Sequence, residues 1–442
     1  MKQKTFTLVE LLFIISVTVS SLITAILNDL SLVLAICPGL FLLVVISLRK
    51  GFSIKKLRTS SWTGVKRNKD VAWLLAFIGI LLPTWYLAGT IRDLNDLSLS
   101  LIHPGYFFTI TFVVTAIMSL IVGSAIGSLS IVGVPLIGAA DILGFPLAIV
   151  GGALVSGAFV GDRTSPLSSS FFLLSHSLEL TVRNHFKAIF PTMLWTTGLT
   201  TVIFLLFDLF IDKGTTGEEV LSHHLQEINF TSISISLLPP LVLLVMILAG
   251  KNMKITFSAS IVTALIILVI RGVALDEWFH GIVFGVDAIN GLQQMLPFIL
   301  FILLVGAYSQ MIEDTKLIQP YIEKIFTTNT ALPINTSKSI AVAASVSLIS
   351  PNQSFPIILT GRALLPYWQK HLSKRDLART LADSTVVFAG LVPWSLLAIL
   401  CSTIIGIPVL TYLPFAFFLL LSPLVTFFYS LGQYLQKTNR SN

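Results

Sequence analysis

The chain has 442 residues, of which 55% are hydrophobic and only 11% are charged. Charged residues make up about a quarter of an average soluble domain, so this composition excludes a soluble globular protein. At about 20 apolar residues per crossing, the long apolar stretches predict about ten to twelve transmembrane helices. They do not alternate as the strands of a membrane β-barrel do, so the sequence predicts an all-α polytopic membrane protein.

The formal net charge of +7 is concentrated beside the predicted membrane segments. Lysine and arginine crowd residues 49–69, and the positive-inside rule places this loop in the cytoplasm. Two crossings precede the loop, and Lys437 and Arg440 follow the last crossing, so both termini are expected in the cytoplasm. Orientation accounts for these basic residues, and the expected surroundings are the lipid bilayer of the cell membrane, without a nucleic-acid partner.

Residues 1–207 are predicted to form the first membrane half. Its uninterrupted crossings are predicted at residues 1–27, 30–48, 71–90, 104–122 and 188–207. Residues 123–144 are rich in glycine and small hydroxyl residues, which either pack closely against neighbouring helices or mark an unwound helix. The acidic residues 208–230 are expected to form an external loop, and residues 231–442 are expected to form a second, related half.

The most polar interruption of the first half is the stretch 157–170, which reads Gly-Ala-Phe-Val-Gly-Asp-Arg-Thr-Ser-Pro-Leu-Ser-Ser-Ser. Gly157 and Gly161 allow close backbone approach, and Pro166 disfavours the helical conformation at Ser165. We therefore expect a broken helix, whose free backbone groups lie beside a carboxylate and several hydroxyl groups.

Hard oxygen donors of this kind suit a small cation such as Na⁺. The candidate ligands in the stretch are Asp162, Thr164, Ser165 and Ser168. Arg163 is a candidate charge partner. The alternative interpretation is a short surface loop in which Ser165 and Pro166 only cap the next helix. The density of polar groups between apolar segments favours the functional interpretation.

Two polar interruptions are predicted in the second half. Residues 339–368 number about thirty, which is too few for two spans of about twenty residues each, so a re-entrant hairpin is expected with Asn352 and Gln353 at its tip. Asp383, Ser384 and Thr385 form a second cluster of a carboxylate and hydroxyl groups as the chain re-enters the membrane. The alternative is that this second cluster is only a helix N-cap after a basic loop.

These two clusters resemble the NhaC-type sodium/proton antiporter family. The matching stretches are Gly157–Phe159, Gly161–Ser168, Gly291–Met295, Thr360–Arg362, Leu377–Asp383 and Pro393–Trp394. The resemblance spans most of residues 105–400 and implies secondary transport by two related halves, with Na⁺ coupling and exchange of a proton or an organic solute. Ser169 and Ala382 stand where family members usually carry an acidic residue, which leaves Asp162 and Asp383 as the carboxylates at matched positions.

The resulting hypothesis is Na⁺/H⁺ antiport by alternating access, with the two broken regions meeting near the bilayer midplane. Asp162 and Asp383 are expected to ligate Na⁺, and Asn352, Ser384 and Thr385 to form the wall opposite Asp162. Proton coupling requires a carboxylate whose ionisation competes with Na⁺ binding. The alternative cargo is a small carboxylate or amino acid carried with Na⁺ on the same fold, paired with Arg163 or Arg362.

Other classes of function lack a matching pattern in the sequence. We find no nucleotide-binding glycine loop, no paired metal-ligand spacing and no catalytic triad, so neither an enzyme nor a cofactor other than Na⁺ is expected. Cys37 and Cys401 both lie in apolar stretches and indicate neither a metal site nor a disulfide framework. A homodimer is a possible assembly.

Overall fold

The computed structural model describes residues 6–28, 30–101, 103–211, 235–287, 289–326, 331–350 and 352–441. Helices are the regular elements of this part of the chain, where pairing of the β type is limited to one isolated bridge between Val286 and Ile289. By length and apolar composition, 11 of its helices could cross a membrane, or up to 12 when a bent helix pair is counted as one span. The prediction of an all-α polytopic membrane protein is confirmed.

The helices long and apolar enough to span a membrane are α1 (Leu8–Leu27), α2 (Leu32–Arg49), α3 (Ile54–Leu87), α5 (Phe107–Val122), α6 (Ala125–Ile142), α7 (Leu147–Thr164), α9 (Val182–Phe210), α13 (Met253–Ile270), α15 (Leu292–Thr315), α17 (Leu332–Ile349) and α23 (Phe417–Ser441). The bent pair consists of α19 (Lys374–Leu381), the π-helix η2 (Ala382–Val386) and α20 (Val387–Leu391), followed at an angle of 56° by α21 (Leu396–Ile405). The remaining helices are α4 (Thr90–Leu101), η1 (Pro104–Tyr106), α8 (Ser169–Ser177), α12 (Leu238–Leu248), α14 (Leu275–Phe284), α16 (Gln319–Ile325), α18 (Ser354–His371), α22 (Val409–Tyr412) and η3 (Leu413–Phe415).

The basic segment 49–69, predicted as a loop, is largely helical. Helix α3 begins at Ile54, where Ser53 accepts a hydrogen bond from the backbone N–H of Lys56, and continues for 34 residues. At 1.5 Å per residue it is about 51 Å long, and the hydrocarbon core of a bilayer is about 30 Å thick. The basic half of α3 therefore extends beyond the membrane as a continuation of the spanning helix.

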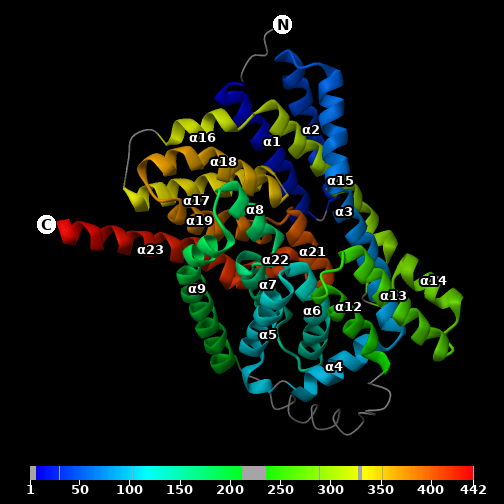
Figure 1. Ribbon diagram of the computed structural model, residues 1–442. Coiled ribbons are helices and arrows are strands. Elements are labelled where there is room, and N and C mark those ends of the chain that lie inside the picture. The colour runs from blue at the N-terminus through cyan, green and yellow to red at the C-terminus, as the bar shows by residue number, and fades with distance from the viewer. Residues whose placement is uncertain are drawn as a thin grey trace.

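Helices α3 and α15 form the most extensive helix pair in the described part of the chain. In Figure 1 they run along one side of the molecule, and α23 extends from the opposite side. Gly64 of α3 and Gly306 of α15 lie face to face. A Cβ atom added to Gly64 would lie 2.0 Å from the carbonyl oxygen of Gly306, and one added to Gly306 would lie 2.6 Å from that of Gly64. The two backbones therefore approach as closely as they do because both residues lack a side chain.

The glycine-rich residues 123–144 contain a continuous helix, α6, so the close-packing alternative is correct for this segment. In α7, Gly157 and Gly161 serve the same purpose, because Cβ atoms there would meet the backbone of α5 at 2.7 Å and 2.0 Å. Helix α7 ends at Thr164, and Ser165 has extended backbone angles (φ −66°, ψ 130°) before Pro166. The predicted helix break is confirmed.

The second predicted interruption is also present, but its two arms are longer than expected. Helix α17 begins at Leu332, before the predicted hairpin of residues 339–368, and α18 ends at His371, beyond it, with 18 residues in each helix. The predicted external loop 208–230 is described only at its start, where Asp208 lies buried in the last turn of α9. Residues 212–230 lie outside the described residues, so the division at this loop stays a prediction.

Candidate functional site

Asp162 lies in the last turn of α7, where the chain leaves the helix and turns into α8. Its side chain is buried, with the residue only 6% exposed. The hydroxyl groups of Ser168 and Ser170 both donate to the Asp162 backbone carbonyl at 2.6 Å, and Ser170 also lies 3.2 Å from Asp162 Oδ2. Ser168 is the N-cap of α8 and accepts a hydrogen bond from the N–H of Phe171. The helix break thus places a carboxylate, a carbonyl and two hydroxyl groups together.

A side chain from the break between α17 and α18 completes the surroundings of this carboxylate. Gln353 Nε2 donates to Asp162 Oδ2 at 2.9 Å and to the backbone carbonyl of Val386 at 3.2 Å. Val386 is the last residue of η2, and a π-helical turn frequently marks a functional site. Gln353 therefore connects the broken helix of the first half to both interrupted regions of the second half.

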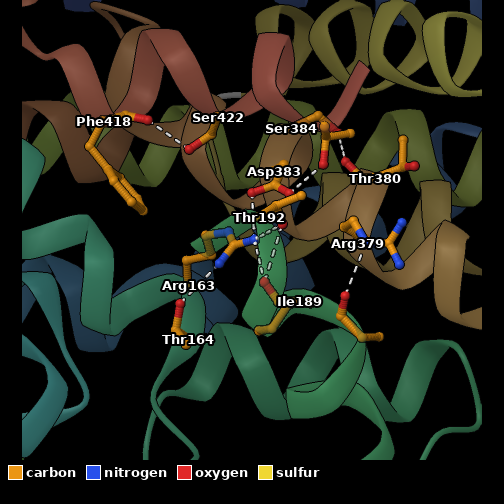
Figure 2. A network of polar contacts seen from close by, with 12 residues as sticks. Arg163, Thr164, Ile189, Thr192, Arg379, Thr380, Asp383, Ser384, Phe418 and Ser422 are labelled. Carbon is orange, nitrogen blue, oxygen red and sulfur yellow. Dashed lines mark hydrogen bonds and ion pairs between the residues drawn. The ribbon is translucent and has the colours of Figure 1, made fainter. Parts of the chain in front are cut away.

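Arg163, the next residue along α7, forms a buried ion pair with Asp383. Arg163 Nη2 lies 2.5 Å from Asp383 Oδ1, and neither side chain is exposed. The guanidinium also donates to Thr164 Oγ1 at 3.1 Å and to Thr192 Oγ1 at 2.9 Å, and Thr426 Oγ1 donates to the other oxygen of Asp383 at 2.5 Å. Figure 2 shows Arg163 extending from α7 toward Asp383, with Thr192 and the Ile189 carbonyl of α9 beside them.

The two buried carboxylates therefore differ in their electrostatic surroundings. Asp383 has a guanidinium counter-ion, so this pair is neutral as a unit. Within the residues that the structure describes, no lysine, arginine or histidine forms an ion pair with Asp162, whose carboxylate accepts hydrogen bonds from the neutral side chains of Ser170 and Gln353. Burying a carboxylate without a compensating charge is costly, so a proton or a bound cation is required to neutralise Asp162.

The structure brings only some of the predicted ligands together. Ser168 donates a hydrogen bond to the backbone carbonyl of Asp162, and Thr164 accepts one from Arg163, which is paired with Asp383. Ser165, in contrast, donates to the Leu120 carbonyl at 2.8 Å and shapes the turn. Its hydroxyl group thus stabilises the helix break itself.

The remaining predicted ligands form contacts away from both carboxylates. Ser384 donates to the carbonyl one helical turn earlier, at Thr380, and the hydroxyl groups of Thr385 and Thr360 lie 3.4 Å apart. Asn352 donates to Asn68 of α3. Asn352, Ser384 and Thr385, predicted to form the wall opposite Asp162, thus form their hydrogen bonds with other groups in the described structure.

Four residues at the site are absent from the predicted ligands. Ser170 and Gln353 belong to polar stretches that the sequence analysis identified. Their positions beside the helix breaks could therefore have indicated them as candidate ligands. Thr192 and Thr426 are single hydroxyl residues within the long helices α9 and α23, and nothing in their local sequence distinguishes them from other threonines. Their roles follow from packing alone.

The donor set of the Asp162 site is typical of a small, hard cation. Carboxylate, carbonyl and hydroxyl oxygens can replace the hydration shell of Na⁺, and the break supplies one or more of each. No cluster of three or more His, Cys, Asp or Glu residues that could hold a metal ion occurs in the described part of the chain. The Asp162 site therefore offers one carboxylate together with neutral oxygens.

Comparisons with known proteins find transporters of similar length. The Malate-2H(+)/Na(+)-lactate antiporter of Bacillus subtilis (strain 168) is 28% identical over 435 residues, which cover 92% of this chain and 91% of the relative. The Na(+)/H(+) antiporter NhaC of Alkalihalophilus pseudofirmus is 28% identical over 398 residues, with 84% and 83% covered. The arginine/ornithine antiporter ArcD of Halobacterium salinarum is 23% identical over 378 residues, with 80% and 76% covered.

The model of the Na+/H+ antiporter family matches residues 4–209 and 216–431. These two matches include both broken helices, the buried Arg163–Asp383 pair and the Asp162 site described above. The resemblance predicted from the two polar clusters is confirmed, and the chain belongs to the Na+/H+ antiporter family.

Proposed function

We propose that this protein exchanges Na⁺ for H⁺ across the membrane by alternating access, with Asp162 as the group that binds the two ions in turn. The observation that carries this proposal is the buried carboxylate of Asp162, whose hydrogen-bond partners among the described residues are neutral. Such a carboxylate is stable when it holds either a proton or a cation.

Competition at one carboxylate is sufficient for antiport. Suppose that Asp162 holds either Na⁺ or H⁺ but not both, and that a loaded site is exposed to each side of the membrane in turn. The protein then carries Na⁺ in one direction and H⁺ in the other. Ser168, Ser170 and the Asp162 carbonyl supply neutral oxygens for Na⁺. We assign these atoms to the Na⁺ site because the helix break gathers them around the carboxylate.

The Arg163 ion pair supports a structural role for Asp383 in the conformation described. The sequence predicted Asp383 as a second Na⁺ ligand, but a carboxylate neutralised by a guanidinium at 2.5 Å attracts a further cation weakly. We therefore propose that Asp383 joins α7 to the bent helix pair, and that Asp162 alone carries the exchanged charge.

The second candidate is exchange of an organic solute with Na⁺, which the names of two relatives suggest. Arg163 and Arg362 were the expected partners of a substrate carboxylate. Arg362 lies exposed on α18, and the buried Arg163 is already bound to Asp383. This observation favours inorganic ions as the cargo.

We also propose that the basic end of α3 and both termini face the cytoplasm of the cell, as the positive-inside rule predicts.

The test is ion-driven proton flux in proteoliposomes with a pH-sensitive dye inside, to which Na⁺, Li⁺ and K⁺ are added in turn. We expect a Na⁺-dependent flux that Asp162→Asn abolishes and that Asp70→Asn leaves intact, because Asp70 lies exposed in an ion pair with Lys254. Where protons compete, the half-saturating Na⁺ concentration should rise about tenfold for each unit of lower pH.

Unchanged flux in Asp162→Asn would overturn the assignment of the site. No proton flux with any of the three cations, together with Na⁺-dependent uptake of a labelled carboxylate or amino acid, would overturn Na⁺/H⁺ exchange in favour of the second candidate.

A further inference from the structure

Asn68 is a buried amide in the middle of α3, far in sequence from both polar clusters. The residue is 2% exposed. Its Nδ2 donates to the Ile302 carbonyl of α15 at 3.1 Å, and its Oδ1 accepts from Asn352 Nδ2 at 3.0 Å. A Cβ atom added to Gly306 would lie 2.8 Å from the Asn68 side chain, so the amide is closely confined. A buried amide needs hydrogen-bond partners, and both its N–H group and its oxygen have one here.

The break between α17 and α18 is held by the α3–α15 pair on two sides. Ser350, at the end of α17, shares a hydrogen bond of 2.9 Å with Ser309 of α15. Asn352 donates to Asn68, and its Oδ1 accepts from the backbone N–H of Ser354 at 2.9 Å, which closes the turn into α18. Both side-chain groups of Asn352 are therefore engaged, one by α3 and one by its own turn.

Gln353 is the next residue, and it carries the contact to the ion site. Its Nε2 lies 2.9 Å from Asp162 Oδ2. A continuous series of hydrogen bonds and one peptide link thus runs from α15 through Asn68, Asn352 and Gln353 to Asp162. Asn352 and Gln353 are joined by a peptide bond, so a displacement of Asn352 also moves Gln353. The hydrogen bond from Gln353 to Asp162 weakens steeply when its distance or angle changes.

We propose that Asn68 is a positioning residue for ion exchange, which fixes Asn352 and thereby keeps Gln353 directed at Asp162. The proposal rests on the proposed role of Asp162. It also links the α3–α15 pair to the ion site, since a displacement of this pair relative to the break must move or rupture the Asn68–Asn352 hydrogen bond.

The expected effect is on Na⁺ binding rather than on maximal flux. A hydrogen bond to a charged group stabilises the ionised carboxylate that holds Na⁺ more than the neutral, protonated form. Loss of the Gln353 contact in Gln353→Ala should raise the half-saturating Na⁺ concentration on the order of tenfold. Asn68→Ala should raise it in the same direction, by no more than Gln353→Ala does.

The experiment measures half-saturating Na⁺ and maximal flux in proteoliposomes for Asn68→Ala, Gln353→Ala and the double variant. If Asn68 acts through Gln353, the double variant should match Gln353→Ala alone; independent roles would multiply the two effects. Thr18→Val is the matched control, because Thr18 Oγ1 is also buried and forms a 2.9 Å hydrogen bond to Tyr308 on α15, outside the series of hydrogen bonds from Asn68 to Asp162. It should keep the wild-type Na⁺ dependence.

A wild-type half-saturating concentration in Asn68→Ala, or effects that multiply in the double variant, would overturn the proposal. If Asn68→Ala does not fold, Asn352→Asp replaces it in the cycle, because it removes the donor to Asn68 and keeps the oxygen that accepts from the Ser354 N–H. The proposed function fails separately, through Asp162→Asn retaining flux.

Discussion

Removing one partner of the buried Arg163–Asp383 pair should destabilise the protein far more than removing one partner of an exposed pair. In Asp383→Asn the Arg163 guanidinium stays fully buried and keeps its hydrogen bonds to Thr164 and Thr192, but it loses its only counter-ion in the described structure. Removing one partner of a buried ion pair costs about 3–5 kcal/mol, because the charge that remains is uncompensated.

The exposed comparison is Lys254 with Asp70, whose atoms are 2.7 Å apart and whose side chains are 35% and 64% exposed. Water solvates either charge when the other is removed, so Lys254→Ala should cost less than about 1 kcal/mol. The two pairs thus differ mainly in burial, and the comparison isolates the cost of an uncompensated charge.

The double variant Arg163→Met/Asp383→Asn tests whether charge is the cause. It removes both charges, and replacing a buried pair by neutral groups of similar size is often close to neutral for stability. We therefore expect it to recover most of the free energy of unfolding lost in Asp383→Asn. The assay is equilibrium unfolding of the purified protein in mixed micelles with increasing denaturing detergent, followed by tryptophan fluorescence.

Two results would refute this reasoning. One is a loss of stability in Asp383→Asn as small as that in Lys254→Ala, which would mean that burial of the pair has no energetic consequence. The other is a double variant as unstable as Asp383→Asn, which would assign the loss to packing instead of uncompensated charge.

Two further predictions concern the helices that position the site. Gly161→Ala should lower both the thermal midpoint of unfolding and the Na⁺-dependent flux, because its Cβ would lie 2.0 Å from the backbone of Ser119 and force α7 away from α5. Gly198→Ala is the control and should change neither quantity, because no atom lies within 4 Å of the added Cβ. Asp208→Ala should destabilise the protein by about 1–2 kcal/mol in the same unfolding assay. The Asp208 carboxylate accepts hydrogen bonds from two backbone N–H groups in the first turn of α5, each at 2.9 Å. A decrease in the free energy of unfolding below a few tenths of a kcal/mol would contradict this role.

The sequence by itself determined the membrane-spanning helices and the places where they break. The length of an apolar run and the backbone restrictions of a proline and its neighbour are local properties. The break after Thr164 and the interruption near Asn352 were therefore predictable, and Asp162 and Asp383 were identified as membrane carboxylates. The helical continuation of the basic segment into α3 was not predicted, because positive charge indicates the side of the membrane but not the backbone conformation.

Only the tertiary structure decided which polar groups meet. Consecutive residues of an α-helix point about 100° apart, so the neighbours Asp162 and Arg163 face different partners, Gln353 and Asp383. Which partner each one reaches depends on the rotation and close approach of helices distant in sequence. For the same reason Asn352, although at the predicted break, is directed at Asn68 of α3 instead of Asp162, a contact that no local pattern indicates.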